Sequence, residues 1–156
     1  MNPACMLSVV RSVESYRAFR IQPGDRNRLV LLFDPTVTDH SLTVCVEIFD
    51  QGGGTPYHRH HRADEMFYIL KGEGILVCDG QEIPLKTGDS VLVRPNGLHE
   101  IHNVGRGRLY ALSVMVPNED FAELVANGTP ADLDAEDIAV LTQQAAAKPL
   151  DLAPVA

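Results

Sequence analysis

The hydrophobic and polar positions between Asn27 and Val116 form short apolar runs separated by turn residues. The runs are rich in Val, Ile, Leu and Phe, and their lengths and spacing are typical of strands in an all-β sandwich or barrel. The predicted strands cover residues 29–33, 41–49, 66–70, 74–78, 90–93 and 109–116.

Turn signals separate several of these runs. Asp79-Gly80 lies between the run 74–78 and a short apolar stretch around Ile83, and Asp-Gly is a favoured pair for a two-residue hairpin turn. Gly88-Asp89 and Pro95-Asn96-Gly97 are further turn signals. The segment around 83 therefore joins the sheet as a hairpin strand.

After Pro117 the pattern changes from strands to helices. Asn118 is a suitable N-cap and Gly128 a suitable stop for a first helix. A second helix is expected to start at Asp134. An apolar stripe of the first helix consists of Phe121, Leu124 and Val125.

This pattern divides the chain into three parts. The expected parts are a β-barrel with N-terminal strands over 1–117, C-terminal helices over 118–147 and a loose tail over 148–156. Candidate N-terminal strands are residues 7–10 and 16–21.

Composition and charge narrow the class of protein. The 156 residues are 45% hydrophobic and 22% charged, as in one packed globular domain. The net charge of −8 argues against a nucleic-acid partner, which needs a basic surface. No apolar run reaches the ~20 residues of a membrane span, and the N-terminus lacks a signal-peptide pattern, so we expect a cytoplasmic protein with no membrane partner. Cys5, Cys45 and Cys78 are an odd number without CxxC spacing, which favours reduced, structural cysteines.

Five of the six histidines fall between His58 and His102, inside the strand-rich segment. In a strand, residues two apart point to the same face, so His58 and His60 can direct both imidazoles into one cavity. Glu65 opens the next strand, and an antiparallel arrangement would place it beside them. His99 would supply a third imidazole, with His102 as its substitute if the register slips.

Three neutral imidazoles and one carboxylate suit a divalent first-row transition metal better than Ca²⁺ or Mg²⁺. The hypothesis is therefore one divalent ion per chain (Fe, Mn, Ni or Zn), held by His58, His60, Glu65 and His99. With a divalent ion, these four ligands give a site with a net charge of about +1, and an octahedral ion would keep two open coordination positions. A small polar or anionic metabolite would suit such a site.

Residues 52–72 resemble the first motif of the cupin superfamily: a glycine, five residues, His-x-His, four residues, Glu, six residues and a glycine. Gly52, His58, His60, Glu65 and Gly72 fill every position of that motif.

The second cupin motif runs from a glycine through a Pro-x-Gly turn to a histidine and, four residues later, an asparagine. Residues 88–103 resemble it from Gly88 to His99 and Asn103, with Pro95 one place late and Asn96 at the turn-glycine position. Asparagine tolerates the left-handed conformation that such a turn requires.

The resemblance implies a double-stranded β-helix, or jelly roll, with the metal inside the barrel mouth and the short helical extension at its C-terminal side. It also implies a homodimer that pairs through an N-terminal strand. The family contains dioxygenases, isomerases, lyases and non-enzymatic binders, so the fold alone does not choose among them.

The leading hypothesis is a metal-dependent enzyme acting on a small metabolite, with dioxygenase (oxidoreductase) chemistry in view. The alternatives are a non-catalytic binder of a sugar or organic acid, and a metal-dependent isomerase or lyase. Beyond the four ligands the sequence offers no convincing inward-facing general acid or base, so no catalytic residue is assigned. That favours oxygen chemistry or simple binding over proton transfer.

Overall fold

The computed structural model describes residues 8–144, which form ten strands, one 3-10 turn and two short helices. The strands are β1 (Arg17–Arg20), β2 (Asn27–Leu31), β3 (Thr43–Phe49), β4 (Asp64–Lys71), β5 (Glu73–Cys78), β6 (Gln81–Lys86), β7 (Ser90–Val93), β8 (His99–Asn103), β9 (Leu109–Val116) and β10 (Thr129–Ala131). The 3-10 turn is Val13–Ser15, and the helices are α1 (Phe121–Ala126) and α2 (Ala135–Leu141).

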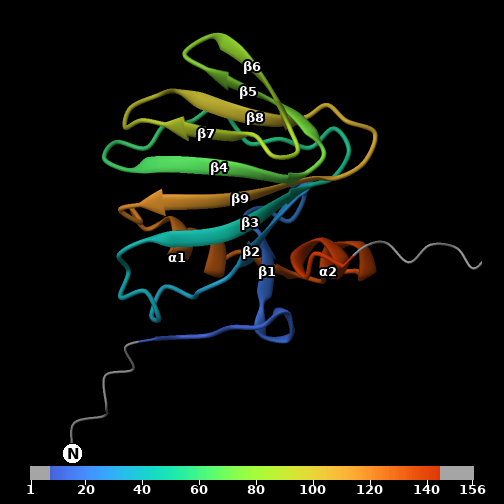
Figure 1. Ribbon diagram of the computed structural model, residues 1–156. Coiled ribbons are helices and arrows are strands. Elements are labelled where there is room, and N and C mark those ends of the chain that lie inside the picture. Colours follow the sequence, from blue (N-terminus) through green and yellow to red (C-terminus); the bar gives the residue numbers. More distant parts are fainter. Residues whose placement is uncertain (1–7, 145–156) are drawn as a thin grey trace, which may run out of the picture.

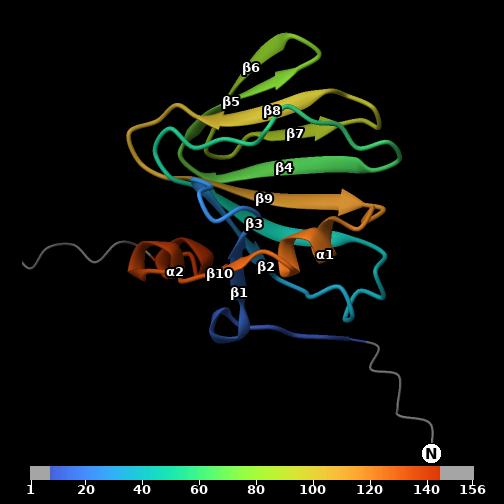
Figure 2. The same cartoon turned by 180° about the vertical axis from the view of Figure 1, so that it is seen from behind.

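The strands build two antiparallel sheets. The larger has the order β10-β1-β2-β3-β9-β4-β7, and the smaller has the order β6-β5-β8. Both helices lie toward the β1–β2 end of the molecule, away from the smaller sheet (Figures 1 and 2). The predicted fold class, a jelly roll with short C-terminal helices, is confirmed.

The strand predictions agree with the structure at the centre of the chain and differ at its ends. Strands β7 and β9 have the predicted bounds, and β1 falls within the predicted range 16–21. Residues 8–10 of the predicted range 7–10 form no strand, and residue 7 lies outside the described residues. Strand β10 was not predicted, because three residues that include a proline give no periodic signal. It pairs with β1 and forms the edge of the larger sheet, where a missing N–H is tolerated.

Two turns have the conformations that their residues predicted. Asp79 and Gly80 have φ angles of 47° and 79°, and Cys78 pairs with Gln81 across them, as in a two-residue hairpin. Asn96 is left-handed, with a φ of 69°. The chain therefore turns at Asn96 and enters β8 at His99.

The first helix begins later than predicted. Its N-cap is Asp120, not Asn118, because Glu119 and Asp120 adopt left-handed conformations with φ angles of 50° and 61°. Asn118 still contributes, since its side-chain oxygen accepts a hydrogen bond from the Ala122 N–H at 2.9 Å. The second helix begins after Asp134, as predicted, and residues 145–156, with the expected tail, lie outside the described part of the chain.

A buried polar cluster fixes α2 against the outer face of the larger sheet. Asp137 is fully buried and accepts hydrogen bonds from the Arg28 guanidinium at 2.5 Å and the Tyr110 hydroxyl at 2.9 Å. Arg28 is itself 5% exposed, so Asp137 balances a charge that has almost no access to water. This ion pair links the C-terminal helix to β2.

The space between the two sheets holds a closed apolar core at one end. Phe49, Phe67 and Ile69 from the larger sheet pack there against Leu76 and Ile101 from the smaller sheet. Polar inward-facing side chains occupy the other end, next to α1. Among the described residues, no helix is long and apolar enough to cross a membrane.

Candidate metal site

Four side chains converge at the polar end of the barrel. His58, His60, Glu65 and His99 each place one nitrogen or oxygen atom within 4.8 Å of the others. Glu65 comes from the start of β4 and His99 from the start of β8, whereas both other histidines come from the segment between β3 and β4. The structure thus brings together all four residues that the sequence singled out as candidate ligands.

The segment that carries His58 and His60 is not the regular strand that the sequence predicted. It contacts β8 through two isolated bridges, Gly54 with His102 and His58 with His99. Pro56 lies between the bridges and has no N–H to extend a ladder. The neighbour of His58 is therefore β8 and not the Glu65 strand, which pairs with β7 and β9.

Glu65 is held in place by a hydrogen bond that Ser113 donates to one oxygen of its carboxylate. Its Oε1 accepts from the Ser113 hydroxyl at 3.0 Å, while Oε2 lies 3.2 Å from Nε2 of His60 and 3.1 Å from Nε2 of His99. Burial alone would raise the pKa of Glu65, but the contacts with the two histidines outweigh it and lower the pKa to about 2. Glu65 is therefore an ionised carboxylate, as a metal ligand must be.

Backbone carbonyl groups orient two of the imidazoles. Nδ1 of His58 lies 2.7 Å from the Pro56 carbonyl oxygen, and Nδ1 of His99 lies 2.9 Å from that of Gly97. A proton on each Nδ1 donates to these oxygens and leaves the Nε2 lone pair for a metal. Burial lowers the pKa of His58 and so keeps its ring neutral. Burial opposes the charged form of His99 too, but hydrogen bonding to Glu65 raises its pKa.

His60 provides the test of whether a cation fits. Its Nε2 is buried and, within the described residues, has no hydrogen-bond partner, because the nearby Glu65 oxygen lies outside hydrogen-bonding geometry. A buried nitrogen without a partner is costly unless something else binds its lone pair. Together with an ionised carboxylate and two oriented imidazoles, this nitrogen forms a donor set that fits a divalent transition metal.

The loop between His60 and Glu65 is anchored by a residue that follows β9, the strand next to β4. The Glu119 carboxylate accepts hydrogen bonds from the backbone N–H groups of His61, at 3.1 Å, and Arg62. Desolvation opposes the charged form of Glu119, but these backbone hydrogen bonds outweigh it and lower its pKa. Glu119 therefore helps to set the distance between the His60 and Glu65 ends of the loop.

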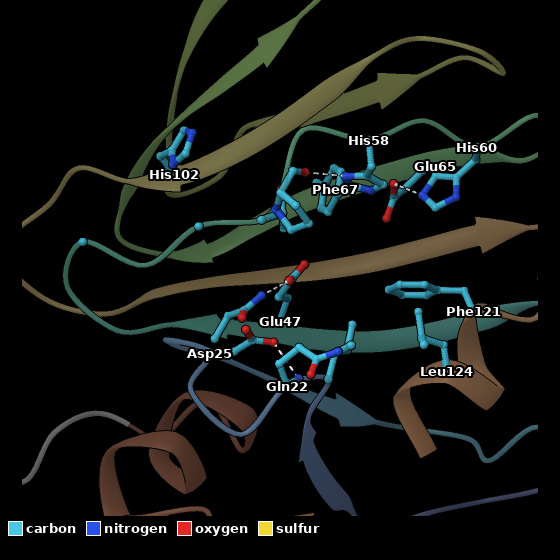
Figure 3. Close-up of a pocket in the computed structure, with 16 residues that line it drawn as sticks. Gln22, Asp25, Glu47, His58, His60, Glu65, Phe67, His102, Phe121 and Leu124 are labelled. Atoms are coloured by element: carbon cyan, nitrogen blue, oxygen red, sulfur yellow. Dashed lines mark hydrogen bonds and ion pairs between the residues drawn. The ribbon is translucent and has the colours of Figure 1, made fainter. Parts of the chain in front are cut away.

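A cavity of about 740 Å³ opens beside the four side chains. Figure 3 shows His58, His60 and Glu65 on one side of it, with Phe121 and Leu124 from α1 and the segment of Gln22 and Asp25 on the other. His102 also lines the cavity but is not one of the four convergent residues, so the slipped register that would have used it in place of His99 does not occur.

Glu47 was missed in the sequence. It is 5% exposed, lies on β3 with its side chain inside the barrel and lines the same cavity. Burial, reinforced by the Glu65 charge, raises its pKa to about 8. The expectation that no inward-facing acid or base accompanies the ligands is therefore wrong. The available signal was a single charged residue within the apolar run 44–49, on the same alternating face as Cys45 and Phe49.

Neither of the two described cysteines belongs to the cluster. Cys45 is buried, Cys78 is half-buried, and both are free. Burial raises the pKa of Cys45 far above its usual range, so its thiol is protonated and inert. Cys5 lies outside the described residues.

A jelly roll with three histidines and one glutamate converging at its open end defines a cupin-type barrel. In agreement with this class, residues 45–115 match the family model described as "Cupin domain". The chain contains a cupin domain, and the resemblance of its two motifs to the cupin superfamily is confirmed.

Comparison with known proteins gives several relatives. The chain is 34% identical over 65 residues to the oxalate-binding protein of Thermotoga maritima, an alignment that covers 42% of this chain and only 54% of that protein. It is 29% identical over 86 residues to the pectin degradation protein KdgF of Dickeya dadantii, covering 55% and 77% of the two chains. A crystal structure from Thermotoga maritima described as a predicted oxalate decarboxylase superposes with a TM-score of 0.62 at 25% identity, covering 70% of this chain and 99% of that one.

Proposed function

We propose that this protein binds one divalent transition-metal ion through His58, His60, Glu65 and His99, and uses it to bind a small organic acid in the adjoining cavity. The observation that carries the proposal is the convergence of these four donor atoms within 4.8 Å, with His58, His60 and Glu65 lining that cavity. The donor set has one negative charge, so a divalent ion leaves a net positive charge for an anion. The oxalate-binding relative supports the same ligand class.

We further propose that the protein is an enzyme. A bound divalent ion would supply Lewis acidity to a substrate oxygen or a site for dioxygen. The residues around it would hold the substrate, and the apolar walls from Phe67 and α1 would exclude bulk water. Iron as the bound metal would direct assays to oxygen uptake, whereas nickel, manganese or zinc would favour isomerase and lyase assays.

Glu47 favours an isomerase or lyase reaction. A buried carboxyl group whose pKa is raised to about 8 is matched to proton transfer near neutral pH. A metal-dependent isomerase or lyase is therefore the second candidate function. Non-catalytic binding of a sugar or organic acid needs no such group.

Metal content per chain tests the site. Untagged protein purified anaerobically without chelator should contain about one equivalent of metal by elemental mass spectrometry. His58→Ala and His60→Ala should lose it, whereas His61→Ala, a change at the neighbouring exposed histidine, should keep it. The assignment fails if His58→Ala retains one equivalent at unchanged affinity, or if the wild type takes up no metal on reconstitution.

We also propose that two copies of the chain pair, and the exposed apolar side chains favour the outer face of the larger sheet over the N-terminal strand that the family resemblance implies. Tyr68, Leu92 and Val116 lie on that face of adjacent strands and are 41%, 53% and 51% exposed. Exposed apolar side chains gathered in one place are typical of an interface. Light scattering should report twice the chain mass for the wild type and the single mass for Leu92→Asp, and a wild-type monomer would refute the pairing.

A further inference from the structure

Glu47 occupies a second polar position in the cavity, apart from the four convergent donors. Figure 3 places its carboxyl group between the histidine cluster and the segment of Gln22 and Asp25. Strand β3 carries it inward between Cys45 and Phe49, which are both fully buried. Its backbone is thus fixed by a central strand of the larger sheet, so the position of the carboxyl group is rigid.

One oxygen of Glu47 is engaged and the other is free. Oε1 accepts a hydrogen bond at 2.7 Å from the side-chain amide of Asn27, which is itself buried on β2. Among the described residues none donates a hydrogen bond to Oε2. Oε2 is also absent from the set of buried polar atoms that lack a partner, so it is accessible to solvent. The small exposed part of Glu47 therefore faces the cavity, where Oε2 is available to a ligand.

No lysine or arginine compensates Glu47 among the described residues. The residues that line the cavity include no lysine or arginine, and no described cation forms an ion pair with this carboxyl group. A carboxylate at the distal end of a ligand would lie near Glu47 with no lysine or arginine to balance its charge, which is unfavourable in a buried site. A hydroxyl group has no such conflict, because it donates to an ionised carboxylate and accepts from a protonated one.

Building on the proposed metal site, we propose that Glu47 is a specificity-determining residue that hydrogen-bonds a hydroxyl group of the ligand. The ligand class that follows is a small monocarboxylic acid with hydroxyl groups beyond its metal-binding end. The acid end would be held at the metal and the distal hydroxyl at Oε2 of Glu47. Asn27 acts as the positioning residue, since it fixes the other oxygen of the carboxyl group.

Two probes with the same metal-binding end test this assignment. Threonate (2,3,4-trihydroxybutanoate) and 2-hydroxybutanoate share an α-hydroxycarboxylate group, and only threonate carries distal hydroxyls. Calorimetry on metal-loaded wild type should give about tenfold tighter binding of threonate, the effect of one additional buried hydrogen bond. In Glu47→Met the two probes should bind within about twofold of each other, while exposed Glu82→Gln, the control for loss of one charge, should keep the preference.

Elemental analysis of every sample separates the two proposals. If the wild type contains metal but binds both probes with equal affinity, or binds neither, the role of Glu47 is overturned and the metal site stands. An unchanged threonate preference in Glu47→Met overturns it as well. If the wild type takes up no metal, both proposals fail.

A second measurement covers the case in which Glu47→Met does not fold. In wild-type protein labelled at glutamate carboxyl carbons, the Glu47 resonance, assigned with Glu47→Gln, should shift on adding threonate and stay in place on adding 2-hydroxybutanoate. Equal shifts with both probes, or none with either, would contradict direct contact with the distal hydroxyl.

Discussion

Replacing Glu47 by glutamine should change how the stability of the metal-free protein depends on pH. In the native state burial raises the pKa of Glu47 to about 8, whereas in the unfolded chain the group titrates near 4.5. At a pH between these two pKa values, Glu47 keeps its proton in the native state and has released it in the unfolded state. The free energy of unfolding therefore falls as the pH rises through this window. Glutamine cannot ionise, so the variant lacks this loss.

The size of the effect follows from the two pKa values. One pKa unit corresponds to about 1.4 kcal/mol, so a displacement from 4.5 to about 8 amounts to roughly 5 kcal/mol over the whole window. Between pH 5 and pH 8 the same linkage gives roughly 3–4 kcal/mol. The unfolding free energy of Glu47→Gln minus that of the wild type should become more positive by this amount over that interval.

Urea unfolding of both proteins at pH 5, 6, 7 and 8, with chelator present, measures this difference. Titrating groups that do not interact with Glu47 are common to the two proteins and cancel, and exposed Glu82→Gln controls for the general loss of one negative charge. A difference that is the same at pH 5 and pH 8 within about 0.5 kcal/mol would refute the reasoning, since it lies far below the linkage expected for a buried acid. It would mean that Glu47 is solvated or paired in the native state.

Three further changes have expected outcomes. Asp137→Ala should lower the free energy of unfolding by about 3–5 kcal/mol in urea titrations because it leaves Arg28 buried without its partner, and a loss below about 1 kcal/mol would contradict this. Gly72→Ala should cost about 2 kcal/mol, since Gly72 has a φ of 103° and a Cβ there would lie 2.7 Å from a carbonyl oxygen. Gly107→Ala, with open space around its Cβ, should be nearly neutral, and similar melting temperatures for both variants would contradict the argument. Zinc at a hundred times its Kd should stabilise the wild type by about 2.7 kcal/mol and His60→Ala hardly at all, and equal stabilisation of both would count against the site.

The barrel was predictable because its strands carry strong local signals. Apolar runs bounded by Asp79-Gly80 and by the turn at Asn96 specify β5 and β7 almost residue by residue. Strand β10 has no such signal, since its pairing with β1 depends on how the chain returns after α1. The start of α1 was misplaced for a related reason. The left-handed conformations of Glu119 and Asp120 allow Glu119 to reach the backbone of His61, a long-range contact that no local capping rule contains.

The four candidate ligands were found from spacing, but the arrangement behind them was not. Alternation along an assumed strand led to His58 and His60, although their segment touches β8 only at isolated bridges. The His-x-His spacing identifies the pair whether or not the backbone is a regular strand. The roles of Ser113, which holds Glu65, and of Asn27, which holds Glu47, depend on neighbours across the sheet that one sequence does not reveal.

The two buried glutamates of the cavity owe their different states to their partners. Both lose hydration, which by itself raises the pKa of each. Glu65 faces His60 and His99, and these contacts overcome burial and lower its pKa to about 2. Glu47 accepts its one described hydrogen bond from the neutral amide of Asn27, and burial with the Glu65 charge outweighs both this bond and the nearby His99, so its pKa rises to about 8. Environments that separate the pKa values of two neighbouring acids divide their tasks. One carboxylate is thereby suited to bind a cation, and the other to hold or exchange a proton with whatever the cation binds.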